Sequence, residues 1–288
     1  MSKLRPRRSV LYMPAANERA LEKAKTIASD ALIFDLEDAV SPESKDAARE
    51  NAVKAASSGD YGNREVTIRC NGLDTPWGAA DIAAAAKSCA SSIVIPKVGN
   101  VAMVDEVSKH LDAAGAPKEM TIWAMIETPS AIFNAREIAA HPRVAVLVMG
   151  TNDLVKELRA VQIAGRAPVI SHLATALLAA REANKPILDG VYNDIKNADG
   201  FRDECTQGMQ MGFDGKTLIH PDQVAIANDV WAPSAADVEH SRRVIEAFNV
   251  ARAEGKGVVQ LDGKMIENLH VANAERTIAI ADAIAELA

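Results

Sequence analysis

The sequence predicts an α/β protein built as a (β/α)8 TIM barrel with a C-terminal helical extension. Short runs of β-branched and other apolar residues alternate with longer stretches of helical spacing, the pattern of strand–helix units around a parallel sheet. Eight such runs occur within the 288 residues, close to the roughly 250 residues usual for this fold. Each run turns polar only at its carboxyl end, as expected for strands that are covered on both faces.

The predicted strands have short helix-start and helix-stop signals between them. Asn17 can cap a helix over 18–28, and Ser41 followed by proline can start the next one. Gly115, Gly200 and Gly255 are expected to end helices. An open doubly wound sheet is the alternative, but the segment MPAANERA after the first strand lacks the glycines of a phosphate loop. The strands are predicted at residues 9–14, 31–38, 66–72, 92–98, 121–128, 145–153, 186–192 and 216–221.

The chain continues for some 65 residues after the eighth strand, although a barrel needs only one helix there. We therefore expect a barrel core over 1–222. Residues 223–288 are expected to form the final barrel helix and an extension, with helices near 235–254 and 268–287. This extension could cover the mouth of the barrel or contact a neighbouring subunit.

Composition is that of an ordinary globular protein, with 48% apolar and 25% charged residues. No apolar run approaches the roughly 18 residues of a membrane span, and the N-terminus has no signal-like apolar core, so a cytoplasmic protein without membrane contact is expected. The spacing of Cys70, Cys89 and Cys205 suggests neither disulfides nor zinc, and mostly buried thiols are expected.

The net charge of −7 argues against nucleic-acid binding, but the charge is unevenly distributed. Residues 1–25 contain seven Lys or Arg against two Glu, a local +5, which leaves −12 for the rest of the chain. The basic segment suggests an anionic ligand.

Polar side chains gather at the carboxyl ends of the predicted strands, which converge on one mouth in such a barrel. They are Asp35, Glu37, Asp38, Arg69, Asn71, Lys97, Glu127, Asn152, Asp153, Asp189, Asn193 and His220.

A divalent cation would neutralise the carboxylates in this mouth. Oxygen ligands without clustered Cys or His select Mg2+, with Mn2+ possible. Glu127 and Asp153 follow adjacent strands and are the best pair for direct ligation. Asp35, Glu37 and Asp38 are better suited to holding metal-bound waters, although Asp38 could equally be only a helix cap or a solvated charge.

Arg69 has a guanidinium fork suited to a carboxylate, although it could instead pair with Glu37. An arginine beside a hard metal suits a 2-oxo or 2-hydroxy acid, whose carbon–carbon bond the metal could help to form or break. Backbone N–H groups near Asn152 could bind the same carboxylate. His220 could touch ligand or hydrogen-bond the backbone.

Eight motifs run in one order along nearly the whole chain. They are RSVLYMPAANERALEKA, FDLEDAV, IRCNGLDTPWG, IVIPKVG, IETPSAI, MGTNDL, GFDGKTLIHPDQV and LDGKMIENLHVANAER. Together they resemble the citrate lyase beta subunit and malyl-CoA lyase family of the HpcH/HpaI aldolase superfamily. The resemblance implies a TIM barrel that uses Mg2+ to cleave or form a carbon–carbon bond between the enolate of a CoA thioester and a 2-oxo acid.

The resemblance also implies roles for residues. Arg69 matches the substrate-carboxylate arginine, and Glu127 and Asp153 match the metal ligands. Glu267 matches an acidic residue, often aspartate, that reaches a neighbouring subunit's site as acid or base. A homo-oligomer, a trimer or hexamer, is therefore expected. The residues that match the CoA-binding segments are Tyr12, Asn17, Lys23 and His220.

Malyl-CoA and citramalyl-CoA are the first candidate substrates, but three alternatives remain. One is the citryl-thioester lyase subunit of a citrate lyase complex, whose thioester is carried by an acyl carrier protein. The presence of Glu267 in the tail favours a free-standing CoA enzyme instead. Another is a metal-dependent aldolase without a thioester, which would not need the basic N-terminal segment. The third is a non-catalytic component that binds CoA or acyl carrier protein, which would not need Arg69, Glu127 and Asp153.

Overall fold

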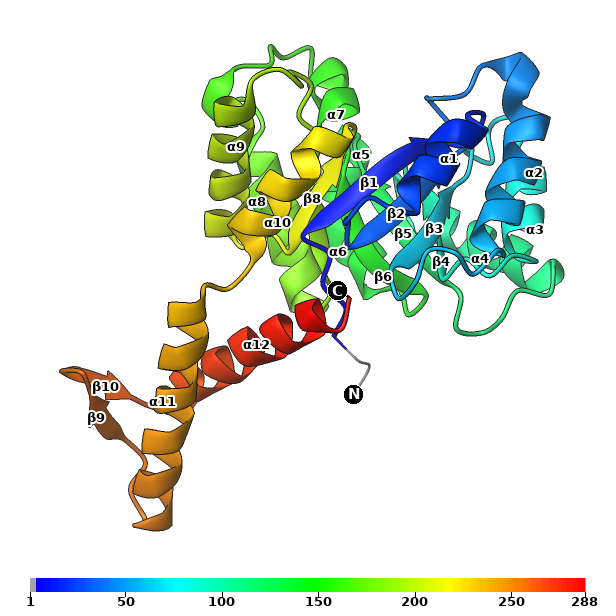
Figure 1. Cartoon of the computed structure of the whole chain (residues 1–288). Helices are drawn as coiled ribbons and strands as arrows, with labels where there is room; N and C mark the ends of the chain where they lie inside the picture. The colour runs from blue at the N-terminus through cyan, green and yellow to red at the C-terminus, as the bar shows by residue number, and fades with distance from the viewer. Residues whose placement is uncertain (1–3, 288) are drawn as a thin grey trace. The chain divides into compact units, whose positions relative to one another are not determined.

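The computed structural model describes residues 4–287 and shows a closed barrel of eight parallel strands in sequential order. The predicted fold is therefore confirmed, and the open-sheet alternative is wrong because β1 pairs with β8. Helices follow the strands and surround the barrel (Figure 1). The barrel strands are β1 (Ser9–Pro14), β2 (Ala31–Asp35), β3 (Glu65–Arg69), β4 (Ser92–Ile95), β5 (Thr121–Ile126), β6 (Val144–Met149), β7 (Ile187–Asp189) and β8 (Gly215–Leu218).

The helical segments of the barrel follow these strands. Asn17 caps α1 as predicted, because its side chain accepts a hydrogen bond from the Ala20 N–H, but the helix ends at Ala24. Gly200 lies inside α9 rather than at a helix end. The helical segments are α1 (Glu18–Ala24), η1 (Pro42–Ser44), α2 (Lys45–Ala56), α3 (Gly78–Ala85), α4 (Val101–Ala113), α5 (Pro129–Phe133), α6 (Ala135–Ala140), α7 (Thr151–Glu157), η2 (Ala164–Arg166), α8 (Ile170–Glu182), α9 (Ala198–Met211), η3 (Pro221–Gln223) and α10 (Val224–Trp231).

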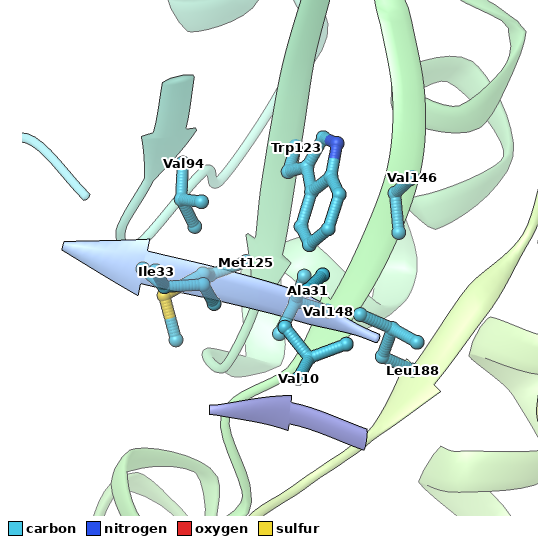
Figure 2. Packing of buried hydrophobic residues seen from close by; sticks show 9 residues of the cluster. All are labelled: Val10, Ala31, Ile33, Val94, Trp123, Met125, Val146, Val148 and Leu188. Atoms are coloured by element: carbon cyan, nitrogen blue, oxygen red, sulfur yellow. The ribbon is translucent and has the colours of Figure 1, made fainter. Parts of the chain in front are cut away.

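The barrel interior is filled by side chains that alternate along the strands (Figure 2). Trp123 is the largest of them and is fully buried, with the Arg7 guanidinium 5.2 Å from its ring centroid. The cluster consists of Val10, Ala31, Ile33, Val94, Trp123, Met125, Val146, Val148 and Leu188. This packed layer supports the mouth, where the same alternation places polar residues.

A second compact unit comprises residues 231–288 together with 1–6. Of these, 1–3 and 288 lie outside the described residues, including Lys3 of the basic segment. Its elements are α11 (Ala235–Ala253), an antiparallel pair β9 (Val259–Leu261) and β10 (Lys264–Ile266), and α12 (Asn268–Ala285). The barrel unit spans 7–230, so α10 falls almost entirely within it. Val244, Phe248, Ile266 and Ala274 form the small core of the second unit.

Among residues 4–287, no helix is both long and apolar enough to cross a membrane.

Candidate active site at the barrel mouth

Strand alternation and register bring four site positions to the inside of the mouth. Asp35 continues the inward series of β2, and it pairs in register with Arg69 at the end of β3. Glu127 follows Trp123 and Met125 on β5, and the register pairs Ile126 with Met149. Glu127 and Gly150, which follow these two paired residues, therefore lie side by side at the carboxyl ends of β5 and β6.

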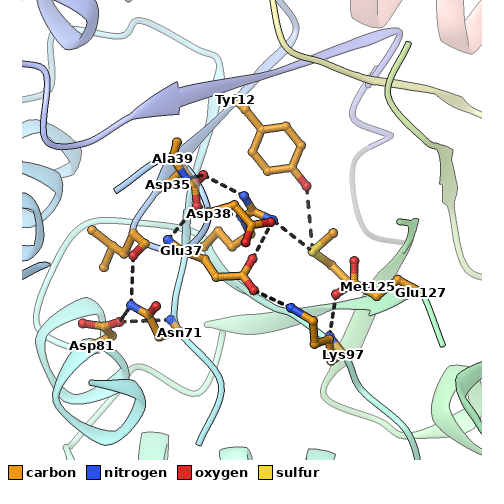
Figure 3. A network of polar contacts seen from close by, with 12 residues as sticks. Tyr12, Asp35, Glu37, Asp38, Ala39, Asn71, Asp81, Lys97, Met125 and Glu127 are labelled. Carbon is orange, nitrogen blue, oxygen red and sulfur yellow. Dashed lines mark hydrogen bonds and ion pairs between the residues drawn. The ribbon is translucent and has the colours of Figure 1, made fainter. Parts of the chain in front are cut away.

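Arg69 is buried and held by carboxylates from β2 and the loop after it. Figure 3 labels these carboxylates, Asp35, Glu37 and Asp38. Its Nε and Nη2 donate to the two oxygens of Asp35, both at 2.7 Å. Its Nη1 lies 2.7 Å from Glu37 Oε2. The guanidinium also lies over the Tyr12 ring, 4.7 Å from the centroid. Asp35 thus engages one edge of the fork and Glu37 pairs with Nη1, so a substrate carboxylate would have to share Nη1 with Glu37 or displace it.

Asp35 differs from its expected role of holding metal-bound waters. Besides Arg69, its carboxylate accepts hydrogen bonds from the N–H groups of Glu37 and Ala39. The contacts occupy both oxygens, so Asp35 orients Arg69 and the loop. Asp38 is exposed and lies 3.5 Å from Arg69.

Glu127 is only 2% exposed, and its carboxylate has a fixed orientation. Oε1 accepts the main-chain N–H of Lys97 at 2.7 Å. A Cβ at position 150 would fall 2.0 Å from Oε2, so only glycine leaves room for this carboxylate. Burial raises the pKa of Glu127 to about 7, because the charged form loses hydration.

Lys97 joins Glu127 to Glu37 but was not among the predicted catalytic or binding residues. Its Nζ donates to Glu37 Oε1 at 2.9 Å. Glu37 Oε2 is buried and makes no hydrogen bond of good geometry despite its ion pair with Arg69. The only sequence signal for Lys97 was its place at the polar end of the fourth strand. That pattern does not predict the hydrogen bond between its main-chain N–H and Glu127.

Asn152 and Asp153 lie in the first turn of α7, next to Gly150. Asn152 exchanges two amide hydrogen bonds with Asn193, of 3.2 and 2.7 Å, and Asn193 also donates to Gln162. This amide pair links the first turn of α7 to the loop after β7. Asp153 is half-buried, and its charge contributes to the raised pKa of Glu127.

A buried network beneath the mouth fixes the loop after β2. Lys45 Nζ donates to the Leu36 and Glu37 carbonyls and to Asn71 Oδ1, at 2.7 to 2.8 Å. Asn71 in turn donates to Asp81, which is fully buried. Asn71 was predicted to face the mouth, but it belongs to this supporting layer.

Asp189 is not part of the mouth, contrary to expectation. Leu188 faces the barrel interior, so its neighbour Asp189 points outward. There it accepts hydrogen bonds from Lys216 Nζ at 3.0 Å and from Arg166 Nη1 at 2.7 Å. Lys216 Nζ also donates to Glu204 of α9 at 2.8 Å, so the cluster is a buried ionic support between the barrel and α9.

The basic N-terminal segment is largely used inside the protein. Arg7 pairs with Glu65 and Arg8 with Asp30, each within 3 Å, before β1 begins. Arg19 and Lys23 remain exposed on α1. Within the barrel unit, Arg19 and Lys23 are therefore the cationic side chains of the basic segment that are exposed to solvent.

The remaining predicted ligand residues lie in different surroundings. Tyr12 lies with Arg69, and its hydroxyl is 3.9 Å from Met125 Sδ, so it does not share the α1 surface of Lys23. His220 caps η3, where its Nδ1 accepts the Asp222 N–H.

Glu267 belongs to the second unit, in which it is exposed and precedes α12. Of the thiols, Cys70 and Cys205 are buried and Cys89 is exposed, which agrees with the expectation of mostly buried thiols.

The donor set fits a hard divalent cation. Glu127 Oε2 faces the space that a Cβ at Gly150 would fill, and Asp153 supplies a second carboxylate nearby. Within residues 4–287, no group of three or more Asp, Glu, His or Cys side chains forms a complete metal cage. Two carboxylates with water or substrate oxygens in the other positions suit Mg2+, which retains several such ligands.

Known proteins resemble this chain along its length. A family model described as HpcH/HpaI aldolase/citrate lyase matches residues 8–221. The (3S)-malyl-CoA thioesterase of Cereibacter sphaeroides is 50% identical over 280 residues, covering 97% of this chain and 96% of the thioesterase. Citrate lyase subunit beta of Escherichia coli K12 is 36% identical over 271 residues, covering 92% and 90%.

A solved structure shares the architecture. The protein CitE from Mycobacterium tuberculosis, in complex with magnesium, acetoacetate and coenzyme A, superposes with a TM-score of 0.76 and 27% identity, covering 96% of this chain and 98% of CitE. The resemblance inferred from the motifs is confirmed: this chain belongs to the HpcH/HpaI aldolase/citrate lyase family of enzymes.

Proposed function

We propose that this protein hydrolyses a coenzyme A thioester that ends in a 2-hydroxy carboxylate, with (3S)-malyl-CoA as the first candidate. The observation that carries the proposal is the linked series Arg69, Glu37, Lys97 and Glu127 at one mouth, which offers a cation for a carboxylate beside a hard-metal site. The relative that is 50% identical is named a (3S)-malyl-CoA thioesterase, which supports both the substrate and the reaction.

Substrate binding follows from the orientation of these side chains. Arg69 would receive the terminal carboxylate through Nη1, since Asp35 holds its other edge. Glu127 and Asp153 would hold Mg2+, and Asn152 would contact the substrate beside them. A cation held by these carboxylates would supply Lewis-acid chemistry to the oxygens of the substrate.

Water is the proposed nucleophile. Burial raises the pKa of the Cys205 thiol to about 12 and that of Cys70 well above its usual range, so neither is an activated thiolate. In hydrolysis, the water oxygen bonds to the thioester carbon and the carbon–sulfur bond breaks. One water proton ends on the sulfur, which leaves as the thiol of CoA, and the other is released as the new carboxylate ionises.

Carbon–carbon cleavage, which the sequence analysis favoured, is the second candidate. The 36% identity to a citrate lyase subunit supports it, and it would use the same bound substrate. Loss of the hydroxyl proton and rupture of the adjacent carbon–carbon bond would give glyoxylate and, after protonation of the enolate carbon, acetyl-CoA. A citryl thioester on an acyl carrier protein and a purely binding role remain alternatives.

Product analysis separates these reactions. Purified protein should be supplied with Mg2+ and (3S)-malyl-CoA, citramalyl-CoA or citryl-CoA. With (3S)-malyl-CoA, malate and free CoA without glyoxylate would support hydrolysis, whereas glyoxylate and acetyl-CoA would support cleavage; with the other two substrates the corresponding hydroxy acid or 2-oxo acid makes the same distinction. Turnover only after addition of an acyl carrier protein would favour the citrate lyase role. Glu127→Ala should abolish turnover, with Glu106→Ala on the exposed face of α4 as the matched control.

We further propose that Lys23, Asn17 and His220 contact the CoA portion, as the motif resemblance implies, and that Tyr12 lines the same path near Arg69. Lys23→Met should raise KM for the CoA thioester, and this effect should shrink with added salt because the contact would be electrostatic.

Glu267 is proposed as an acid or base that acts across a subunit boundary in a homo-oligomer. Subunit mixing tests this role. Glu127→Ala and Glu267→Gln should each be inactive alone, and mixed oligomers should recover activity only if one site uses residues of two chains. Failure of properly mixed oligomers to recover any activity would contradict action between subunits.

A further inference from the structure

Lys97 has an unusual backbone conformation. It lies two residues after β4 and has a φ of +51°. Side chains with a Cβ are disfavoured in this left-handed region, which glycine adopts without strain. A lysine here therefore indicates that its side chain contributes something that glycine could not.

The main chain and the side chain of Lys97 make different contacts. The main-chain N–H donates to Glu127 Oε1, whereas the ammonium donates to Glu37 Oε1 (Figure 3). Any residue except proline could supply the first contact. Only the second contact, at the half-exposed end of the side chain, needs a cation.

The ammonium lies in the field of the metal-binding carboxylates. Burial opposes its charge, but Glu37, Glu127 and Asp153 all act to raise the pKa of Lys97 above its ordinary value. With every group ionised, the two cations of the mouth face five carboxylates, a net charge of −3. The residues counted are Arg69 and Lys97, and Asp35, Glu37, Asp38, Glu127 and Asp153.

We propose that the Lys97 ammonium is a built-in counter-charge that lowers the affinity of the mouth for divalent cations and keeps Glu37 bound to protein cations rather than to the metal. Lys97 is thus a positioning residue, and the inference rests on the metal site of the proposed function. A less negative mouth also repels the anionic substrate less, which gives a reason for keeping the charge at a strained position.

The Lys97→Gly variant tests the two contacts independently. It keeps the main-chain N–H, removes the ammonium and relieves the strain of the left-handed backbone. At low salt, Mn2+ titrated into the substrate-free protein by calorimetry should bind about three- to tenfold more tightly to Lys97→Gly and to Lys97→Met than to wild type. Lys97→Arg keeps the charge and should match wild type. Lys109→Met removes an exposed charge on α4 and should also match.

The gain in affinity should shrink in 0.5 M KCl, because screening weakens the field of an exposed charge. A structural defect would not tighten binding, so equal or weaker Mn2+ binding by Lys97→Gly would overturn the counter-charge role while leaving the proposed function intact. Absence of Mn2+ binding by the wild-type protein would overturn both.

Discussion

Replacing Gly150 with alanine gives a direct test of how the mouth holds Glu127. The added Cβ would lie 2.0 Å from Glu127 Oε2 and 2.4 Å from Glu127 Cβ. Non-bonded carbon atoms normally lie about 3.5 to 4.0 Å apart, so the backbone segments at Glu127 and at position 150 must move apart by more than about 1 Å. The clash includes the base of the side chain, and rotation of the carboxylate alone cannot relieve it.

We expect two measurable consequences of Gly150→Ala. The free energy of unfolding should fall by about 1 to 3 kcal/mol, the usual cost of overpacking. Mn2+ affinity, measured by calorimetry, should fall by about 10- to 100-fold or more, since Mg2+-type sites tolerate little displacement of a ligand.

Gly99→Ala is the matched control, because its nearest new contact is Ser130 Oγ at an acceptable 3.4 Å. It should change unfolding and Mn2+ binding little. If Gly150→Ala bound Mn2+ as tightly as wild type, then either Glu127 is not a metal ligand or its packing against Gly150 is unimportant.

Three other outcomes can be measured. Arg69→Lys loses the planar fork that holds Asp35 with one edge and offers Nη1 to the substrate, so kcat/KM on the CoA thioester should fall about 100-fold, and retained activity would contradict carboxylate recognition by Arg69. Burial alone would raise the pKa of Asp189, but Lys216 and a nearby arginine outweigh it and lower this pKa below 3.8. Asp189→Asn should therefore cost about 3 to 5 kcal/mol of unfolding free energy near pH 7. Since Asp189 stabilises the fold only while ionised, the difference from wild type in urea unfolding should shrink below about pH 4. In native protein only Cys89 should react rapidly with a thiol reagent, and a second fast thiol would contradict the burial of the other two.

The sequence by itself determined the barrel and the general location of the site. Eight apolar runs that turn polar at their carboxyl ends predict strands covered on both faces, and the lack of a glycine-rich loop after the first run favours the closed barrel over an open doubly wound sheet. The positions of Arg69 and Glu127 followed from the same pattern. Local sequence also located the Asn17 cap, whose geometry depends on neighbouring residues only.

Only the tertiary structure decided how the polar residues are partnered. Asp189 and Glu127 both follow apolar runs, yet strand alternation turns Asp189 outward to Lys216 and Glu127 inward to Gly150. Likewise, the N-terminal charges looked available for a ligand until long-range pairing placed Arg7 against Glu65. Sequence pattern fixes which face of an element is apolar, but the partner of a buried charge depends on register and on contacts between segments far apart in the chain.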